Sequence, residues 1–256
     1  MKKVEPILTD ENLSKLIGQK ITHHLNGLDN YKKADKQKQL ELSQIGKFLA
    51  TFFPSYDIKQ VREEPDFIIT NGKTEFGLEH EVITNTAIRK QHGFYENIFH
   101  LAERDIQSNT ELPNFLANCY LKSNLSFKTK DKSELIQLVK EVVSSSILKN
   151  EIPENSIIDR IVQMPHSKKK LTVNFGAHIV QNLSANIVCD FIKKKEDKIK
   201  KYFSNTGLDQ WLILLAGGGS EYSYDVIEGL NFEILDTQFR KVFLLADIDN
   251  KLYEIK

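Results

Sequence analysis

The sequence predicts an α/β fold with a central sheet, flanking helices and an N-terminal helical segment. Segments with helical spacing and short apolar runs typical of strands alternate along the chain. No internal repeat or low-complexity linker interrupts this alternation. The 256 residues are 40% hydrophobic and 27% charged, which is enough apolar material for a packed core. We therefore expect a helical segment over residues 1–54 and an α/β core over residues 55–256.

In the first part of the chain, apolar residues at helical spacing predict two helices before the first strands. The first helix is expected over residues 9–28. The second begins in the polar stretch 29–38 and ends at Pro54. A hairpin then follows over residues 62–82, because Asn71-Gly72 favours a tight turn between two apolar-rich runs. A helix over 95–108 and a strand over 115–121 come next.

The second part of the chain continues the alternation. An amphipathic helix is expected over residues 132–149. Strands over 157–164 and 171–175 flank a basic turn, and a long helix is expected over 181–204. Apolar strands over 211–216, 242–246 and 252–255 complete the core, and Gly217-Gly218-Gly219 ends the first of these three.

Bulk properties exclude several classes of protein. The net charge is zero and the pI is about 7.1, which argues against a dedicated nucleic-acid coat protein but allows a nucleic-acid enzyme. Cys119 and Cys189 lie in apolar surroundings and are expected to be buried thiols, since no spacing suggests a zinc site. The N-terminus lacks the apolar stretch of a signal peptide, and no run approaches the ~18 apolar residues of a membrane span. These features predict a soluble, cytoplasmic protein.

The hairpin over residues 62–82 concentrates acidic side chains. If Asn71 and Gly72 are the two turn residues, Thr70 pairs with Lys73 and Asp66 lies opposite Gly77. Asp66 and Glu79 are then diagonal neighbours, roughly 7–8 Å apart at the backbone. Like charges across a ladder destabilise it, so a divalent cation is the simplest compensating partner. An ordinary polar face open to solvent is the alternative. The acidic face comprises Glu64, Asp66, Glu75, Glu79 and Glu81.

Pro65-Asp66, followed by the strand Gly77-Leu78-Glu79-His80-Glu81, resembles the PD-(D/E)xK, or restriction-endonuclease-like, nuclease superfamily. The resemblance implies a mixed central sheet flanked by helices, with a Mg²⁺ (or Mn²⁺) site for phosphodiester hydrolysis. It implies that Asp66 and Glu79 are catalytic metal ligands. The backbone carbonyl of His80 would be a third ligand, and Glu64 would help to bind a second ion. This sequence departs from the family at Glu81, where the family has a lysine that orients or activates the attacking water.

The long helix offers a replacement for that lysine. Lys195, Lys198 and Tyr202, followed by the strand 211–215, resemble a subgroup with a Lys-x-x-Lys-x-x-x-Tyr helix after the acidic hairpin. In related enzymes the catalytic lysine can move to a neighbouring helix. The resemblance therefore implies a catalytic role for Lys195 or Lys198. Alternatively, both lysines extend into solvent from a charge-rich helix end. Glu41, near where some members have a further acid, ranks below Glu64.

The resemblance implies a Mg²⁺-dependent nuclease hydrolase that binds DNA in preference to RNA. The lysines Lys168, Lys169, Lys170 and Lys194 would then follow the nucleic-acid backbone. Two alternatives stay open. One is a catalytically inactive nuclease-like fold that binds nucleic acid or protein, which Glu81 favours. The other is a regulatory protein of a defence or mobile-element cluster whose fold supports an interface. A homodimer and the sequence specificity are also left open.

Overall fold

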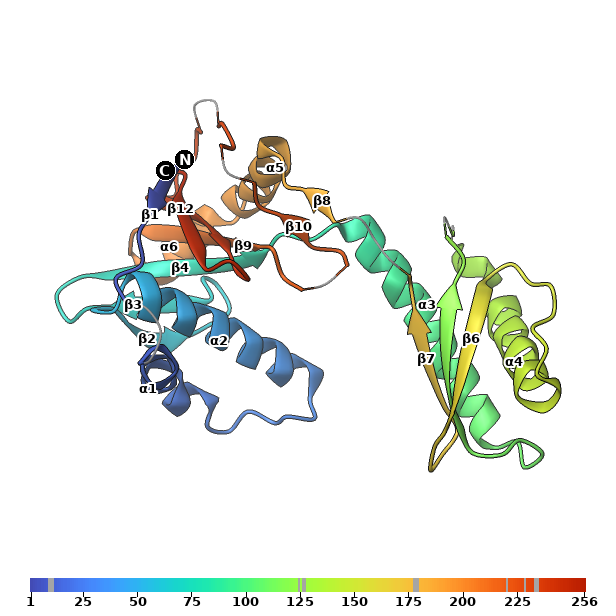
Figure 1. The fold of residues 1–256 in the computed structure, drawn as a ribbon. Coiled ribbons are helices and arrows are strands. Elements are labelled where there is room, and N and C mark those ends of the chain that lie inside the picture. Colours follow the sequence, from blue (N-terminus) through green and yellow to red (C-terminus); the bar gives the residue numbers. More distant parts are fainter. Residues whose placement is uncertain are drawn as a thin grey trace. The chain divides into compact units, whose positions relative to one another are not determined.

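The chain forms two compact units (Figure 1). Unit 1 comprises residues 1–84 and 180–256, and unit 2 comprises residues 85–179. The computed structural model describes residues 1–8, 12–123, 125, 128–176, 180–219, 221–227, 229–232 and 235–256. The predicted α/β class with a mixed central sheet and flanking helices is confirmed. No described helix has both the length and the apolar content needed to cross a membrane.

Unit 1 is built on a mixed sheet of seven strands in the order β1-β12-β11-β9-β4-β3-β2. The three central strands β4, β9 and β11 run parallel, and antiparallel pairs continue the sheet on both sides. This arrangement places the acidic hairpin β3–β4 beside the most apolar strand, β9. The strands are β1 (Lys2–Val4), β2 (Asp57–Val61), β3 (Phe67–Thr70), β4 (Glu75–Val82), β9 (Gln210–Ala216), β11 (Lys241–Ala246) and β12 (Lys251–Glu254).

Helices cover both faces of this sheet. The helices α1 (Leu13–Leu25) and α2 (Lys33–Phe52) share one core with Ile213 and Leu215 of β9. The helices α5 (Ala185–Glu196) and α6 (Ile199–Thr206) share the opposite core with Leu212 and Leu214. Because successive strand residues point to opposite faces, a strand buried on both sides needs an unbroken apolar run. The N-terminal helices thus belong to the same compact unit as the sheet, so the units do not divide at the expected residue 55.

The register of the acidic hairpin differs from the expectation. Thr70 pairs with Glu75 and Phe67 with Leu78, so the turn contains four residues and the two-residue turn is wrong. The Asn71 side chain accepts hydrogen bonds from the backbone N–H groups of Lys73 (3.0 Å) and Thr74 (2.8 Å), which stabilises the longer turn. A shift of two residues keeps every side chain on its expected face. It also moves Asp66 away from Gly77 and toward Glu79.

The long helix expected over residues 181–204 is divided. A short strand, β8 (Gln181–Asn182), pairs with β10 (Tyr224–Asp225) before the helix begins. The Ser184 side chain caps α5 by accepting a hydrogen bond from the N–H of Ile187 (3.4 Å). The helix is interrupted at Asp197 and Lys198, and α6 follows. Residues 193–198 are all charged, so apolar periodicity could not reveal this break.

Unit 2 is an independent sheet covered by two helices. The strands β5 (Phe115–Leu121), β6 (Ile158–Pro165) and β7 (Lys170–Asn174) lie in the order β6-β5-β7. A short helix, η1 (Thr129–Asp131), precedes α4 (Lys132–Lys149), which packs together with α3 (Thr86–Gln107) on the sheet. The predicted strand over 115–121 and helix over 132–149 are confirmed. The core of unit 2 is separate from both cores of unit 1.

The contact between α1 and α2 gives a test of this architecture. A Cβ atom added to Gly46 would lie 2.5 Å from a methyl carbon of the buried Ile21, so the two helices approach too closely for alanine. We expect Gly46→Ala to lower the free energy of unfolding of unit 1 by about 1–3 kcal/mol through overpacking. At Gly18, in α1, the nearest atom would lie 4.0 Å from the added Cβ atom. Gly18→Ala should therefore raise the free energy of unfolding by about 0.5–1 kcal/mol. Chemical denaturation of the two variants measures both effects, and equal values would contradict the close packing.

Candidate functional site

The acidic face of the hairpin is covered by α5 and α6 and receives a lysine. The Lys195 ammonium lies 2.7 Å from one carboxylate oxygen of Glu79 and 2.7 Å from one of Glu81. Glu79 is buried, with 3% of its surface exposed, and Lys195 is largely covered. Glu79 and Glu81 project to the same side of β4 because they are two residues apart. The structure thus supports the predicted proximity of Lys195 to the acidic hairpin.

Asp66 stands beside this ion pair in a distinct state. Its carboxylate accepts a hydrogen bond from the His80 backbone N–H (2.9 Å), which ties the two hairpin strands together. Burial, followed by the negative charge of Glu79, raises the pKa of Asp66 to about 7. Asp66 nevertheless keeps part of its surface exposed to solvent, whereas Glu79 does not. Asp66 is therefore a partly exposed residue whose carboxyl group can change protonation near neutral pH.

Two further buried oxygens belong to this site. They are the second carboxylate oxygen of Glu79 and the hydroxyl of Tyr202, which comes from α6. Burial raises the pKa of Tyr202, and the charge of Glu79 and a hydrogen bond with its side chain raise it further. Burial alone would lower the pKa of Lys195, but the Glu79 and Glu81 carboxylates raise it, so the lysine stays charged.

Glu64 and Lys198 lie farther from the centre. Glu64 pairs with Lys201 at 2.5 Å, and Lys198 lies 4.0 Å from the other Glu64 oxygen. Among the described contacts, Lys198 has none with Asp66 or Glu79. Of the two predicted catalytic lysines, the structure brings only Lys195 to the buried carboxylates. Lys201 was not anticipated, and nothing in the sequence separates it from the other lysines of this charged run.

Glu41 and His80 complete the surroundings from the other face. Glu41, on α2, pairs with Lys38 (3.0 Å), and its charge helps to raise the pKa of Asp66. The His80 ring lies 3.0 Å from the Gln44 side chain, and burial lowers the pKa of this histidine to about 4. His80 is therefore neutral at pH 7. Its backbone, rather than its ring, acts on Asp66.

Among the described residues, no group of three or more histidine, cysteine, aspartate or glutamate side chains is arranged to hold a metal ion. The Lys195 ammonium lies between Glu79 and Glu81. It thus provides the positive charge that the sequence analysis assigned to a divalent cation. This contact explains physically how like charges coexist on the hairpin.

The lysines expected to contact nucleic acid are divided between the units. Lys168, Lys169 and Lys170 lie at the β6–β7 turn of unit 2, where Lys170 pairs with Glu103 (2.9 Å). Lys194 lies on α5 of unit 1, with its ammonium 4.6 Å from the centre of the Phe191 ring. Three of these four residues thus belong to unit 2 and one to unit 1.

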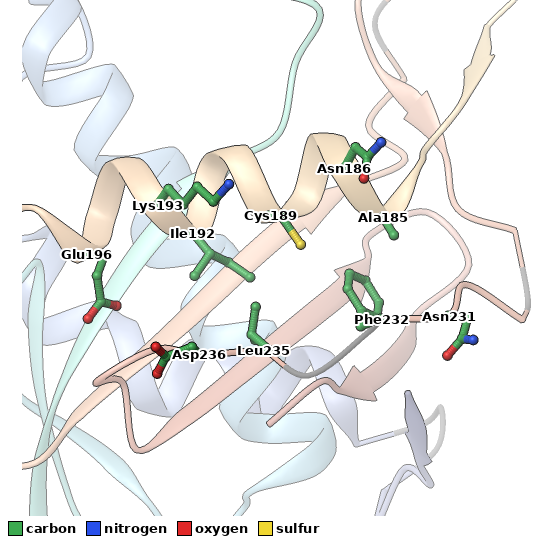
Figure 2. A pocket seen from close by; sticks show the side chains of 10 residues that line it. All are labelled: Ala185, Asn186, Cys189, Ile192, Lys193, Glu196, Asn231, Phe232, Leu235 and Asp236. Atoms are coloured by element: carbon green, nitrogen blue, oxygen red, sulfur yellow. The ribbon is translucent and has the colours of Figure 1, made fainter.

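A separate pocket in unit 1 lies between α5 and the segment before β11 (Figure 2). Its volume is about 470 Å³, within the range of small-molecule sites. Cys189, expected to be buried, is partly exposed in its wall, whereas Cys119 is buried as predicted. No sequence pattern indicates this pocket, because its two walls come from segments that are distant along the chain. The lining residues are Ala185, Asn186, Cys189, Ile192, Lys193, Glu196, Asn231, Phe232, Leu235 and Asp236.

Comparison with known proteins points to a different activity from the one expected. The chain is 24% identical over 209 residues to the ribosomal protein L11 methyltransferase of Helicobacter hepaticus. The match covers 78% of this chain and 57% of that protein, so the chain spans little more than half the length of the relative. No protein-family model and no solved structure matches.

This similarity corrects two expectations, the activity and the cofactor. It contradicts the predicted activity, that of a Mg²⁺-dependent nuclease and hence of a hydrolase. It also contradicts Mg²⁺ as the cofactor, in agreement with the missing ligand set among the described residues. The alternative of an inactive nuclease-like binding module receives no support from it either. Membership of the restriction-endonuclease-like superfamily, a nucleic-acid partner and a homodimer stay predictions.

Proposed function

We propose that unit 1 is an enzyme whose active centre is the cluster formed by Asp66, Glu79 and Lys195. The observation that carries the proposal is the grouping of Asp66, Glu79 and Lys195, in which Asp66 is a partly exposed residue whose pKa is raised to about 7 by burial and by Glu79. A general acid or base works best when its pKa lies near the operating pH. Perturbed carboxyl groups of this kind are concentrated at active sites. Asp66 is the proton carrier of the proposed reaction.

The neighbouring groups fit supporting roles in this proposal. Lys195 neutralises Glu79 and Glu81, and its charge would stabilise negative charge that develops on a substrate. The Tyr202 hydroxyl interacts with Glu79 and would help to fix the position of this carboxylate. At the level of the fold, we propose that unit 1 is a restriction-endonuclease-like core. The succession of acidic hairpin, lysine-bearing helix and apolar strand supports this assignment, which concerns architecture and not the reaction.

The accessibility and state of Asp66 can be tested by chemical modification. A carbodiimide activates protonated carboxyl groups, so at pH 6.5 Asp66 should couple to glycine ethyl ester faster than ordinary exposed carboxylates. Mass spectrometry of peptides from the full chain locates the label, with Glu75, an exposed residue of the same hairpin, as an internal control. Coupling at Asp66 that is no faster than at Glu75 would contradict the proposed proton carrier.

The methyltransferase relative favours a second candidate, binding of S-adenosylmethionine in the pocket along α5. The chemistry of the lining fits such a molecule: Ile192, Phe232 and Leu235 offer apolar contact for a base, and Asp236 offers an acceptor for hydroxyl or ammonium groups. When bound, this cofactor would supply the methyl group. Asn186 and Asn231, at the other end of the pocket, could hydrogen-bond the edge of the base.

Calorimetry with S-adenosylmethionine tests the second candidate. We expect micromolar binding to the full chain and at least tenfold weaker binding after Asp236→Asn, since a carboxylate acceptor is lost. Asp190→Asn is the matched control, because Asp190 is exposed on α5 and does not line the pocket. Transfer of labelled methyl to ribosomal protein L11, the substrate named for the relative, would extend the result. Heat signals that are absent, or equally weak in both variants, would reject this candidate.

A further inference from the structure

The last turn of α5 carries no apolar side chain that could fix its position on the sheet. Residues 193–198 are all charged, and α5 ends within this run at Glu196. The apolar side chains that α5 contributes to the core end at Ile192. Lys195, which reaches the acidic hairpin, lies beyond that point. Polar contacts therefore determine where this turn lies.

Glu196 makes such contacts with both of its carboxylate oxygens. One oxygen accepts a hydrogen bond from the Thr237 hydroxyl, and the other accepts one from the Gln238 backbone N–H (2.9 Å). Thr237 is buried, and its hydroxyl in turn accepts a hydrogen bond from the Phe239 backbone N–H (3.3 Å). Glu196 also lines the pocket along α5 (Figure 2), but both of its oxygens are already bonded within the fold.

The segment that receives Glu196 is attached to the sheet that carries the acidic hairpin. The Arg240 backbone N–H donates a hydrogen bond to the Gln210 carbonyl of β9 (2.8 Å). The strand β9 pairs with β4, which carries Glu79. The last turn of α5 is thus bonded to this sheet and its margin through two adjacent residues, Lys195 and Glu196.

The helix itself gains nothing from a carboxylate at this position. The last turn of a helix favours cations, because its free carbonyl groups carry partial negative charge. Lys193, Lys194 and Lys195 meet this preference, whereas Glu196 opposes it. The role of Glu196 therefore lies in the contacts that it makes outside the helix.

We propose that Glu196 is a positioning residue for Lys195 in the active centre. By holding the end of α5, it fixes the point from which the Lys195 ammonium reaches Glu79 and Glu81. A displacement of about 1 Å in a catalytic arrangement can lower a rate about a hundredfold. This role rests on the function proposed for unit 1, whereas the position of Lys195 can be measured without any reaction.

Acetylation of the full chain by acetic anhydride at about pH 8 reports on Lys195, because only the neutral amine reacts. The carboxylates beside Lys195 keep it charged, so its acetylation is slow in the original protein. Peptide mass spectrometry gives its rate relative to the exposed Lys194 on the same helix. We expect Glu196→Ala to speed acetylation of Lys195 about tenfold, the effect of lowering its pKa by about one, and to leave Lys194 unchanged.

Three matched variants separate positioning from a change in charge or a loss of structure. Glu196→Gln removes the charge but keeps an acceptor for the Gln238 N–H and gains a donor for the Thr237 hydroxyl, so acetylation of Lys195 should stay slow. Thr237→Val removes one of the two contacts and should speed it in the same direction as Glu196→Ala. Asp197→Ala removes an exposed carboxylate from the next residue and should have no effect.

Several outcomes would overturn the proposal. If Lys195 reacts equally slowly in Glu196→Ala and in the original protein, Glu79 and Glu81 alone position the lysine. If Glu196→Gln or Asp197→Ala acts like Glu196→Ala, the effect is one of charge. If Lys194 is accelerated as much as Lys195, the helix end has unfolded and Glu196 is a structural residue.

Urea unfolding followed by Trp211 fluorescence shows whether Glu196→Ala keeps unit 1 folded, and Thr237→Val provides the same test if it does not. The labelling of Asp66 by carbodiimide does not depend on Glu196. Failure of the positioning role and failure of the proposed proton carrier are therefore distinguishable.

Discussion

Replacing Lys195 by methionine should destabilise unit 1 by about 3–5 kcal/mol, the usual cost of removing one partner from a buried ion pair. Methionine fills a similar volume, so the loss of charge dominates the effect. Glu79, which is 3% exposed, would be left beside Glu81 and Asp66 without a compensating cation. Trp211 is the single tryptophan and lies in unit 1, so its fluorescence during urea unfolding reports on this unit alone.

Two further variants separate the buried pair from a general effect of losing a lysine. Lys194→Met removes the neighbouring charge on the same helix, where the side chain contacts only the Phe191 ring among its described contacts, and should cost less than about 1 kcal/mol. Glu79→Gln combined with Lys195→Met should be more stable than Lys195→Met alone, because the buried charge is gone and Glu81 is partly solvated. If Lys195→Met and Lys194→Met unfold at the same urea concentration, the buried pair does not exist in solution.

The elements of the fold could be predicted where local patterns determine them. The apolar run of β9, the alternation in β5 and the periodicity of α4 each reflect burial that a single segment experiences, so the sequence reveals them. The division into units could not be predicted in this way. Residues 85–179 form a self-contained core between two parts of unit 1, and only contacts between distant segments define that boundary.

The candidate site shows the same limit. The grouping of Asp66, Glu79 and Glu81 on one face follows from strand alternation, which survived the error in the turn. The state of these residues did not follow, because it depends on α5 delivering Lys195 to the hairpin from more than a hundred residues away. A cluster of acids predicts a need for positive charge. It does not distinguish a metal ion from an ammonium group, so the sequence alone could not identify Lys195 as the partner.

Replacing Asp66 by asparagine should stabilise unit 1 above neutral pH and have little effect near pH 4. The folded state raises the pKa of Asp66 from 3.8 to about 7, so below pH 4 the carboxyl group is protonated in both the folded and the unfolded chain. As the pH rises from 4 to 7, the unfolded chain loses this proton first, and the folded state becomes progressively less stable. This difference in pKa corresponds to about 4 kcal/mol of stability at pH 8. Asparagine carries no charge and can still accept the hydrogen bond from the His80 N–H.

Urea unfolding followed by Trp211 fluorescence at several pH values between 4 and 8 measures this difference directly. Asp249→Asn, at an exposed position in unit 1, is the control and should differ from the original protein by less than about 0.5 kcal/mol throughout. A stabilising effect of Asp66→Asn that grows with pH means that the ionisable side chain of Asp66 lowers the stability of the fold. Residues of active centres often destabilise their fold in this way. If the variant is instead destabilised equally at all pH values, Asp66 is an ordinary structural hydrogen-bond acceptor. The proposed active centre would then lose its proton carrier.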